Sequence, residues 1–393
     1  MGLPSTQVTT GRINPEGILA GIAPMPSAVP DLYTTGPAIK DKMLELIEGA
    51  TDYILIDSFI ARTDSTTREV KEALKAKHDA GVRVYVVADS CSWFMPGGKV
   101  GYKFLKQAGM PHVEFNPFRP HRFFYFPVMI PRDHRKFWIV DGKVLFLGGA
   151  NIFGESLLPP EEGGNIDYMV AVKSPRAIEH MIESFVVTWN RHSPEKLRSE
   201  EFAVSALDAP ETQVWLFDQN GHVKRRGVIG EMYDTVLSLA KEEVWLVHAY
   251  TFTSRGIMDR IKALTERGIA VNLMLSARSH APRYTRGALY GIKDILDAGC
   301  KVWMYEGGRS ALHSKGVIVD GRWASVGSAN FNRRSCGFSE EANVVFGDEK
   351  SVGKVLRDLE ELKTRCRPVE KEEARRYRNP WYYLTWLVMQ ILG

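Results

Sequence analysis

The stretch HRKFWIVDGKVLFLGGAN, residues 134–151, recurs in the second half of the chain as HSKGVIVDGRWASVGSAN, residues 313–330. Each copy has an apolar run, an Asp-Gly pair and a second apolar run, a pattern typical of a hairpin with a tight turn. Alternate residues of a strand share a face, so the histidine and the lysine two places later are expected to lie together. The two stretches therefore predict the same strand–turn–strand unit twice, with the same polar groups.

The similarity continues outside these two stretches. YILIDSF (53–59) corresponds to VWLVHAY (244–250), and AGVRVYVVAD (80–89) corresponds to RGIAVNLMLS (267–276). Helix-like segments lie between the strand-like runs, and glycine closes several of them. Strands that alternate with such helices predict an α/β fold of two similar halves, with mixed, largely parallel sheets packed face to face.

The repeat also predicts how the chain is divided. Its 393 residues suffice for two halves that each bury a core. We expect an N-terminal extension (1–35), a first half (36–195), a linker (196–212), a second half (213–367) and a basic, aromatic C-terminal tail (368–393).

Composition limits the function only weakly. The chain is 44% hydrophobic and 25% charged, as in ordinary globular proteins, and its net charge of +4 permits an anionic partner without indicating nucleic acid. The four cysteines lack the spacing of a zinc site or a disulfide framework, which favours a reducing compartment. No apolar run reaches 18 residues, and no signal peptide is evident, so we expect no span of a bilayer.

The repeated polar groups predict one composite site. If the halves pack face to face, two imidazoles, two ammonium groups and two amides converge: His134, Lys136, Asn151, His313, Lys315 and Asn330. An excess of positive charge and donors suits a phosphoryl group. One imidazole can attack phosphorus while the other protonates the departing oxygen. The lysines supply the charge that this chemistry needs, so we expect neither a metal ion nor another cofactor.

Four acidic residues have distinct expected places. A nucleophilic imidazole needs a carboxylate to fix its tautomer, and Asp167 and Glu341 each begin an apolar run after the asparagine of their copy. The alternative for both is an ordinary charge at a strand end. Asp141 and Asp320 precede glycine and are expected to form the hairpin turns.

Two further segments suggest contact with a membrane surface. Residues 116–130 form an aromatic, proline-rich and basic loop in the first half, and residues 374–393 combine arginines with aromatic and aliphatic side chains. Both compositions suit the headgroup region of an anionic bilayer. The alternative for the tail is a terminal helix docked on the core.

At these residues the sequence resembles the phospholipase D superfamily, whose signature is His-x-Lys-x4-Asp followed by Gly-Ser-x-Asn. The likeness spans residues 36–365 and is similar in detail to bacterial cardiolipin synthases, through FVVTWN (185–190), GSANFNRRS (327–335) and EEAN (340–343). It implies the phospholipase D fold and a phosphatidyltransferase that makes cardiolipin from phosphatidylglycerol through a covalent phosphatidyl-histidine intermediate. It also implies a peripheral protein at the cytoplasmic face of the membrane.

The resemblance assigns a role to each site residue. His134 matches the nucleophile and His313 the general acid, while the lysines and asparagines match the phosphate binders. Asp167 and Glu341 match the orienting carboxylates, and Asp141 and Asp320 match structural supports. The first copy departs from the signature at one position, because Gly149 stands where the signature has serine.

Two other activities remain open at this point. A phospholipase D would let water take the place of the accepting lipid and release phosphatidic acid. A nuclease acting on single-stranded nucleic acid would use the same groups, with RSHAPRYTR (278–286) as a basic contact. The near-balanced charge and the apolar tail make a nucleic-acid partner the weaker alternative. The sequence gives no indication of the oligomeric state.

Overall fold

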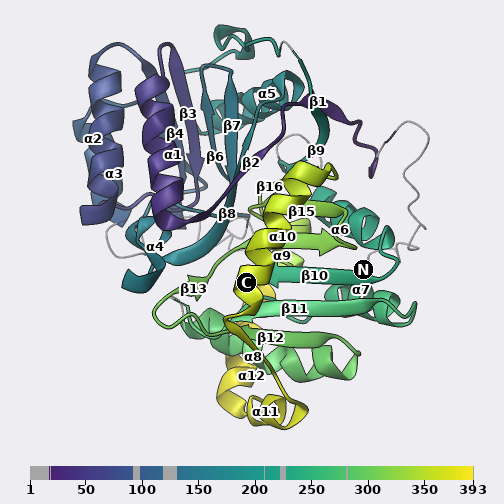
Figure 1. Cartoon of the computed structure of the whole chain (residues 1–393). Helices are drawn as coiled ribbons and strands as arrows, with labels where there is room; N and C mark the ends of the chain where they lie inside the picture. The colour runs from purple at the N-terminus through teal and green to yellow at the C-terminus, as the bar shows by residue number, and fades with distance from the viewer. Residues whose placement is uncertain are drawn as a thin grey trace.

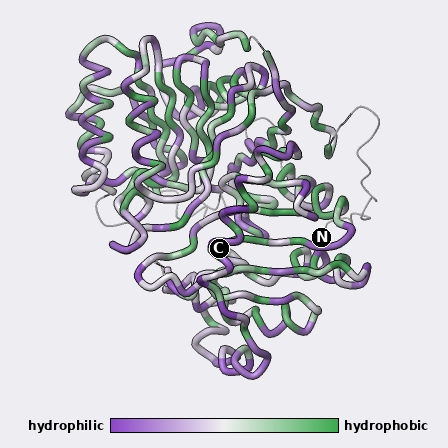
Figure 2. Tube along the Cα trace, in the orientation of Figure 1, coloured by the Kyte–Doolittle hydropathy of each residue, from purple (hydrophilic) through white to green (hydrophobic). Residues whose placement is uncertain are grey.

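Two mixed β-sheets stand against each other, one from each half of the chain, with helices on their outer faces (Figure 1). The computed structural model describes residues 17, 19–91, 98–117, 131–207, 209–221, 227–279 and 282–392. Figure 2 shows hydrophobic residues along the strands of both sheets and hydrophilic residues mainly in loops and on the outer helices.

The first half is built on an eight-stranded sheet in the order β13-β8-β7-β6-β3-β4-β5, with β2 also paired to β8. Its strands are β2 (Asp31–Thr35), β3 (Tyr53–Ser58), β4 (Arg83–Asp89), β5 (His112–Phe115), β6 (Lys136–Val140), β7 (Val144–Gly148), β8 (Asn165–Val172) and β13 (Ala311–Leu312). Its helices are α1 (Gly36–Gly49), α2 (Ser65–Asp79), α3 (Gly98–Gln107), α4 (Gly154–Leu157) and α5 (Pro175–His192).

The second half is built on a nine-stranded sheet in the order β1-β9-β16-β15-β14-β10-β11-β12-β17. Its strands are β1 (Met25–Ser27), β9 (Thr212–Gln219), β10 (Glu243–His248), β11 (Ala270–Ser276), β12 (Lys301–Tyr305), β14 (Lys315–Val319), β15 (Trp323–Gly327), β16 (Glu341–Phe346) and β17 (Cys366–Pro368). Its helices are α6 (Val228–Ser238), α7 (Arg255–Thr265), α8 (Pro282–Asp297), α9 (Arg333–Gly337), α10 (Glu349–Lys363), α11 (Lys371–Arg376) and α12 (Pro380–Leu392).

The two sheets share one strand order, which confirms the prediction of two similar α/β halves. The order β8-β7-β6-β3-β4-β5 of the first half matches β16-β15-β14-β10-β11-β12 of the second. The sheets are mixed as expected, but the expectation that they are largely parallel holds only for β3-β4-β5, β10-β11-β12 and the short pair β13-β8. The remaining pairs are antiparallel. Two of them are hairpins, in which three-residue connections (141–143 and 320–322) reverse the chain between β6 and β7 and between β14 and β15.

The space between the sheets holds one shared core. Val170 of β8 and Val326 of β15 belong to the same buried cluster, so the sheets meet there directly. Phe185 of α5 and Leu359 of α10 belong to it too, which places these two helices between the sheets rather than outside them. The expected face-to-face packing is therefore direct around β7, β8, β14, β15 and β16, whereas α5 and α10 bury their apolar sides in other parts of the space.

Chain segments also cross between the halves. Residues of β1 and β2 lie in the predicted N-terminal extension, and β1 joins the sheet of the second half while β2 joins that of the first. In the predicted linker, Leu197 and Phe202 are buried in the shared core. In the predicted tail, β17 extends the second sheet beside β12.

The two Asp-Gly turns are held by their aspartates, as expected from the sequence. Asp141 and Asp320 have φ angles of 50° and 52°, and the glycines after them also have positive φ, as a type I′ turn requires. The Asp141 carboxylate accepts hydrogen bonds from the backbone N–H groups of residues 51–53, and that of Asp320 from residues 241–243. Each aspartate thus ties its hairpin to the start of the neighbouring strand, β3 or β10.

Candidate active site

Each motif histidine lies on an edge of the other half. The short strand β13, directly before His313, pairs with β8 of the first half, and the His313 N–H donates to the Ile166 carbonyl at 2.7 Å. In the same way, Asp133 pairs with Glu340, and the His134 N–H donates to the Glu340 carbonyl at 3.0 Å. These exchanges place each histidine beside a carboxylate of the opposite half, Asp167 near the start of β8 or Glu341 at the start of β16.

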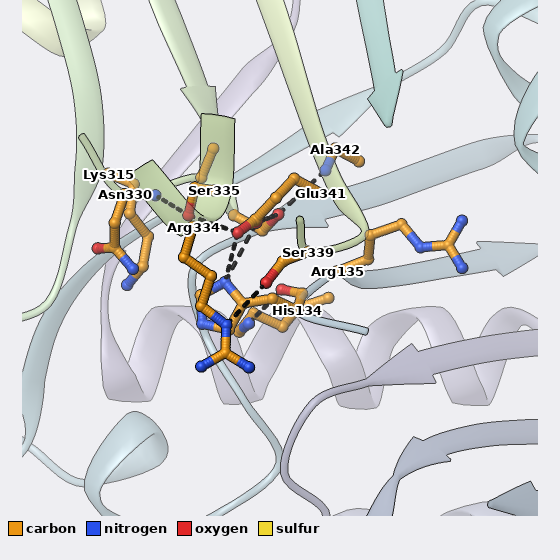
Figure 3. Close-up of polar contacts among 12 residues, drawn as sticks. His134, Arg135, Lys315, Asn330, Arg334, Ser335, Ser339, Glu341 and Ala342 are labelled. Atoms are coloured by element: carbon orange, nitrogen blue, oxygen red, sulfur yellow. Dashed lines mark hydrogen bonds and ion pairs between the residues drawn. The ribbon is translucent and has the colours of Figure 1, made fainter. Parts of the chain in front are cut away.

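His134 is paired with Glu341 of the second half (Figure 3). Its Nδ1 lies 3.1 Å from both carboxylate oxygens. The hydroxyls of Ser328 and Ser335 also donate to this carboxylate, at 2.5 and 2.6 Å. Burial alone would raise the pKa of Glu341, but the neighbouring His134, Lys136 and these hydrogen bonds lower it to about 2. Glu341 is therefore a carboxylate at neutral pH.

His313 is paired with Asp167 of the first half. Its Nδ1 lies 2.6 Å from Asp167 Oδ2, and the Lys315 ammonium lies 2.8 Å from the same nitrogen. The other Asp167 oxygen accepts a hydrogen bond from the backbone N–H of Tyr168 at 2.9 Å. Burial opposes the charge of Asp167, but Lys315 and His313 outweigh it and lower the pKa of this carboxyl.

Both imidazoles are oriented in the same way. Hydrogen bonding of Nδ1 to a carboxylate favours the tautomer in which Nε2 has a free lone pair. Burial, together with the nearby lysines, lowers the pKa of His134 and of His313 to about 4, although the paired carboxylates act in the other direction. Both side chains are 18% exposed, so each ring reaches solvent along one edge. At neutral pH both histidines are thus bases or nucleophiles.

Both lysines interact electrostatically with both carboxylates, Asp167 and Glu341. Each ammonium donates to the carbonyl of the histidine two residues before it. Burial lowers the pKa of Lys136 to about 7 and that of Lys315 to about 8, while Glu341 and Asp167 act to raise both values. Lys315 also acts on His134, and Lys136 on His313. The charged groups of the two halves therefore form one site rather than two.

The two asparagines lie at equivalent places but differ in their contacts. Asn151 Oδ1 accepts a hydrogen bond from the Ile60 N–H at 3.1 Å. Asn330 Oδ1 is buried with no hydrogen-bond partner among the described residues. Both backbone N–H groups donate to a serine five residues later, Ser156 or Ser335. The structure thus brings the predicted histidines, lysines and orienting carboxylates to one place. Each asparagine follows the hairpin of its own copy, and Asp141 and Asp320 lie in the turns.

The absence of a serine at Gly149 has a steric reason. A Cβ built on Gly149 would lie 2.0 Å from Asp167 Oδ1, whereas the equivalent Ser328 donates to Glu341. Aspartate is one methylene shorter than glutamate, and the carboxylate of Asp167 occupies the place that a side chain at Gly149 would take. The first half therefore has no room for the hydroxyl that the second half uses.

Three residues that support the site were not predicted from the sequence: Phe59, Arg135 and Ser335. Phe59 packs on His134, with ring centroids 4.9 Å apart, and the Lys136 ammonium lies 5.1 Å from the same ring. Arg135, between the motif residues, is buried in ion pairs with Asp133 and Asp57. The repeat gives no signal for Arg135, because Ser314 replaces it in the second copy. The sequence match of 53–59 with 244–250 sets Phe59 against Tyr250, but the strand registers make it equivalent to Ala249, so that match is one residue out of register. Ser335 had a signal, since both copies have serine five residues after asparagine.

The donor set of the site does not suit a metal ion. Two ammonium groups lie among its histidines and carboxylates, and positive charges repel a cation. Within the part of the chain that the structure describes, no three histidine, cysteine, aspartate or glutamate side chains are grouped as metal ligands. Likewise, no helix in the described ranges is long and apolar enough to cross a bilayer.

Comparisons with known proteins agree with this geometry. The chain is 28% identical over 335 residues to the cardiolipin synthase of Geobacillus kaustophilus, covering 84% of this chain and 64% of that protein. It is 26% identical over 334 residues to the minor cardiolipin synthase ClsB of Bacillus subtilis, covering 84% and 80%. The chain thus spans less than two thirds of the length of the first of these relatives.

A solved structure has the same fold at low sequence identity. The phosphatidylserine synthase of Haemophilus influenzae superimposes with a TM-score of 0.71 at 14% identity, over 95% of this chain and 98% of that one. The sequence pattern of a family described as "Cardiolipin synthase, PLD-like domain" matches residues 43–189 and 233–363, more than half of the chain. These segments contain both histidine motifs and all the strands that carry them. The chain therefore belongs to the phospholipase D superfamily, in the family of cardiolipin synthase PLD-like domains.

Proposed function

We propose that the protein is a phosphatidyltransferase that makes cardiolipin from two molecules of phosphatidylglycerol. The observation that carries this proposal is the pair of crossed histidine–carboxylate contacts, His134 with Glu341 and His313 with Asp167, between two lysines. Two oriented imidazoles on either side of one anion site can act in turn on the two oxygens of a phosphodiester. Because cardiolipin synthases are among the relatives, we take a phospholipid as the phosphodiester substrate.

In the first step His134 acts as the nucleophile. Its Nε2 lone pair attacks phosphorus of phosphatidylglycerol, a P–N bond forms, and the bond from phosphorus to the headgroup glycerol oxygen breaks. His313, protonated at Nε2, gives its proton to that oxygen, and glycerol leaves. The product is a phosphatidyl group covalently bound to His134, and Glu341 stabilises the positive charge of that ring.

In the second step His313 acts as the general base and His134 is the leaving group. His313, now neutral, takes the proton from the terminal glycerol hydroxyl of a second phosphatidylglycerol. That oxygen attacks phosphorus, the bond to His134 breaks, and cardiolipin is released with both histidines restored. Lys136 and Lys315 balance the negative charge of the non-bridging phosphate oxygens in both steps, and the side-chain amides of Asn151 and Asn330 donate hydrogen bonds to these oxygens.

Whether His313 carries the proton that a general acid must donate depends on bound substrate. In the free protein, burial and the lysines lower the pKa of both histidines to about 4, so neither holds a proton at Nε2 near neutrality. An anionic phosphodiester in the site favours positive charge on its neighbours and raises their pKa values. Substrate binding and protonation of His313 are therefore coupled, and binding takes up protons at neutral pH.

The lipid substrate requires access to a bilayer, and we include a peripheral position at the cytoplasmic face in the proposal. Of the two segments expected to face lipid, residues 118–130 lie outside the described residues. The C-terminal tail is described as far as residue 392 and forms α11 and α12.

The test incubates the protein with phosphatidylglycerol vesicles in the presence of EDTA and follows the lipids by mass spectrometry. Cardiolipin together with free glycerol is the expected result. Phosphatidic acid without cardiolipin would mean that water is the acceptor and would replace the proposal by a phospholipase D activity. Labelled single-stranded DNA is run in parallel, and cleaved DNA with unchanged lipid would replace it by a nuclease.

A further inference from the structure

The C-terminal helix α12 has one docked side and one exposed apolar side. On the docked side, Trp386 Nε1 donates to Thr253 Oγ1 at 3.0 Å, Gln390 Nε2 donates to the Thr253 carbonyl at 3.0 Å, and Met389 is buried against α8 and Phe252. These contacts fix the helix along α8 at one end of the second half (Figure 1). The tail is therefore a docked helix, which is one of the two alternatives raised by its sequence.

The other side of α12 is apolar and uncovered. Among the described residues, seven large hydrophobic side chains are exposed, and five of them belong to α12. Trp381, Leu384, Leu387 and Val388 lie on this side, whereas Tyr383 also packs on Tyr290 of α8. Trp381 is 78% exposed and Leu384 55%. Spacings of three and four residues place Trp381, Leu384 and Val388 along one side of a helix. Such a concentration of apolar side chains marks a contact surface rather than ordinary exposure.

Exposed arginines lie at both ends of this apolar surface. Tyr383 packs on Tyr290 and Met389 lies at Gly287, so α12 runs antiparallel to α8 and ends near its first turn. That turn carries Arg283 and Arg286, which are exposed and form no ion pair within the described part of the chain. At the start of α12, the preceding helix α11 ends in exposed Arg376.

The docked side of α12 contacts elements that support the candidate active site. Thr253, held by α12, belongs to the loop after β10, and in that loop the Ala249 N–H donates to the carbonyl of Ser314, between the second-copy histidine and lysine. Helix α12 also contacts α9, which supplies Ser335 to Glu341. Helix α12, which carries the apolar surface, is therefore packed on the elements that support both histidine–carboxylate pairs.

We infer that α12, with Arg283 and Arg286 of α8, is the surface by which the protein docks on an anionic bilayer. This inference rests on the proposed function for its lipid substrate. Aromatic and aliphatic side chains enter the headgroup boundary, while the arginines neutralise lipid phosphates. A second copy of the chain fits less well, because a two-fold contact through this surface would bring the same arginines together. The bilayer then meets the protein beside its active site.

The apolar part is tested by vesicle co-sedimentation with a Leu384→Gln/Leu387→Gln variant, whose substitutions point away from α8 and keep residues that favour a helix. With phosphatidylglycerol vesicles we expect binding about tenfold weaker than in the wild type. The matched control is Val187→Gln, an exposed apolar residue on α5, which leaves binding unchanged. Circular dichroism verifies that the variant is folded, and Trp381→Ala serves as an independent second variant with the same expected direction.

The cationic part is tested with an Arg283→Gln/Arg286→Gln variant. Its preference for phosphatidylglycerol over phosphatidylcholine vesicles should fall by about fivefold for each arginine at low salt, and the difference should shrink at high salt. An Arg68→Gln/Arg198→Gln variant removes the same charge from exposed side chains of α2 and of the predicted linker, away from α12, and should keep the preference.

The outcomes separate this inference from the proposed function. Sedimentation requires no turnover, so a wild type that binds vesicles through α12 but makes no cardiolipin would refute only the activity. A wild type that makes cardiolipin, with α12 variants that bind vesicles as it does, would refute only the docking surface. A concentration-dependent dimer that the α12 variants dissolve, with vesicle binding unchanged, would assign the surface to a second copy and would also overturn the inference.

Discussion

The two histidines of the site have different supports, although their motifs are copies of one another. The Glu341 carboxylate beside His134 accepts hydrogen bonds from two serine hydroxyls and shares both oxygens with the ring. The Asp167 carboxylate beside His313 makes one short contact to the ring and accepts a backbone N–H. Hydroxyl donors spread the charge of Glu341, whereas Asp167 directs one oxygen at its histidine. The difference suits two imidazoles with unequal roles in one reaction.

The largest expected effects come from the histidines themselves. His134→Asn and His313→Asn should each lower turnover of phosphatidylglycerol by about a thousandfold or more, because each removes a group that acts in both steps. A phosphatidyl ester of p-nitrophenol separates their roles, since p-nitrophenolate leaves without a proton. With this substrate His313→Asn should still release one p-nitrophenolate per protein molecule in a rapid burst, whereas His134→Asn should release none.

Reversed results in this experiment would exchange the two roles. A burst from His134→Asn and none from His313→Asn would make His313 the nucleophile. Substantial turnover of phosphatidylglycerol by either variant would contradict the two-histidine mechanism altogether.

Because Asp167 pairs with His313 and Glu341 with His134, each carboxylate variant should show the same burst behaviour as the variant of its paired histidine. Asp167→Asn and Glu341→Gln should each lower turnover by about a thousandfold, because the amide no longer fixes the tautomer or balances the imidazolium. Although Asp167 belongs to the same half as His134, its variant should keep the p-nitrophenolate burst, as the variant of His313 does. Glu341→Gln should slow the burst itself. Thermal melting of both proteins controls for loss of fold.

Pairing within each half would give the opposite pattern. A burst retained by Glu341→Gln and lost by Asp167→Asn would mean that each carboxylate serves the histidine of its own half.

The sequence predicted the site residues better than their partners. Regular spacing within each copy was enough to select the histidines, lysines, asparagines and turn aspartates, because strand periodicity and turn chemistry are local properties. It did not show that Asp167 serves His313, since this depends on β13 crossing to pair with β8. Phe59 was missed for a related reason, because only contacts between distant segments reveal it. The placement of α5 and α10 between the sheets likewise follows from tertiary packing.

The serine that follows each asparagine allows a matched test of the unequal supports. Ser335 and Ser156 both accept a hydrogen bond from the asparagine backbone, but Ser335 also donates to Glu341 at 2.6 Å. Ser335→Ala should lower kcat/KM by about tenfold, because a hydrogen bond to a charged group contributes about 1.5–3 kcal/mol. Ser156→Ala should change it by about twofold at most. Equal losses would show that the serines act only through the asparagine backbone.

The smallest effect concerns stability at mildly acidic pH. The pKa of each histidine is lowered from its ordinary value to about 4 in the folded protein, so between pH 6.5 and 4 the unfolded chain binds more protons than the folded one. Stability therefore falls as the pH falls through this window, by up to about 1.4 kcal/mol per pH unit for each histidine. Urea unfolding at several pH values should give a shallower slope for His134→Asn, and again for His313→Asn, between pH 6.5 and 5. Above pH 7 the histidines are neutral in both states, so the slopes of wild type and variants should coincide there. A variant slope as steep as that of the wild type would mean that its histidine keeps an ordinary pKa when folded.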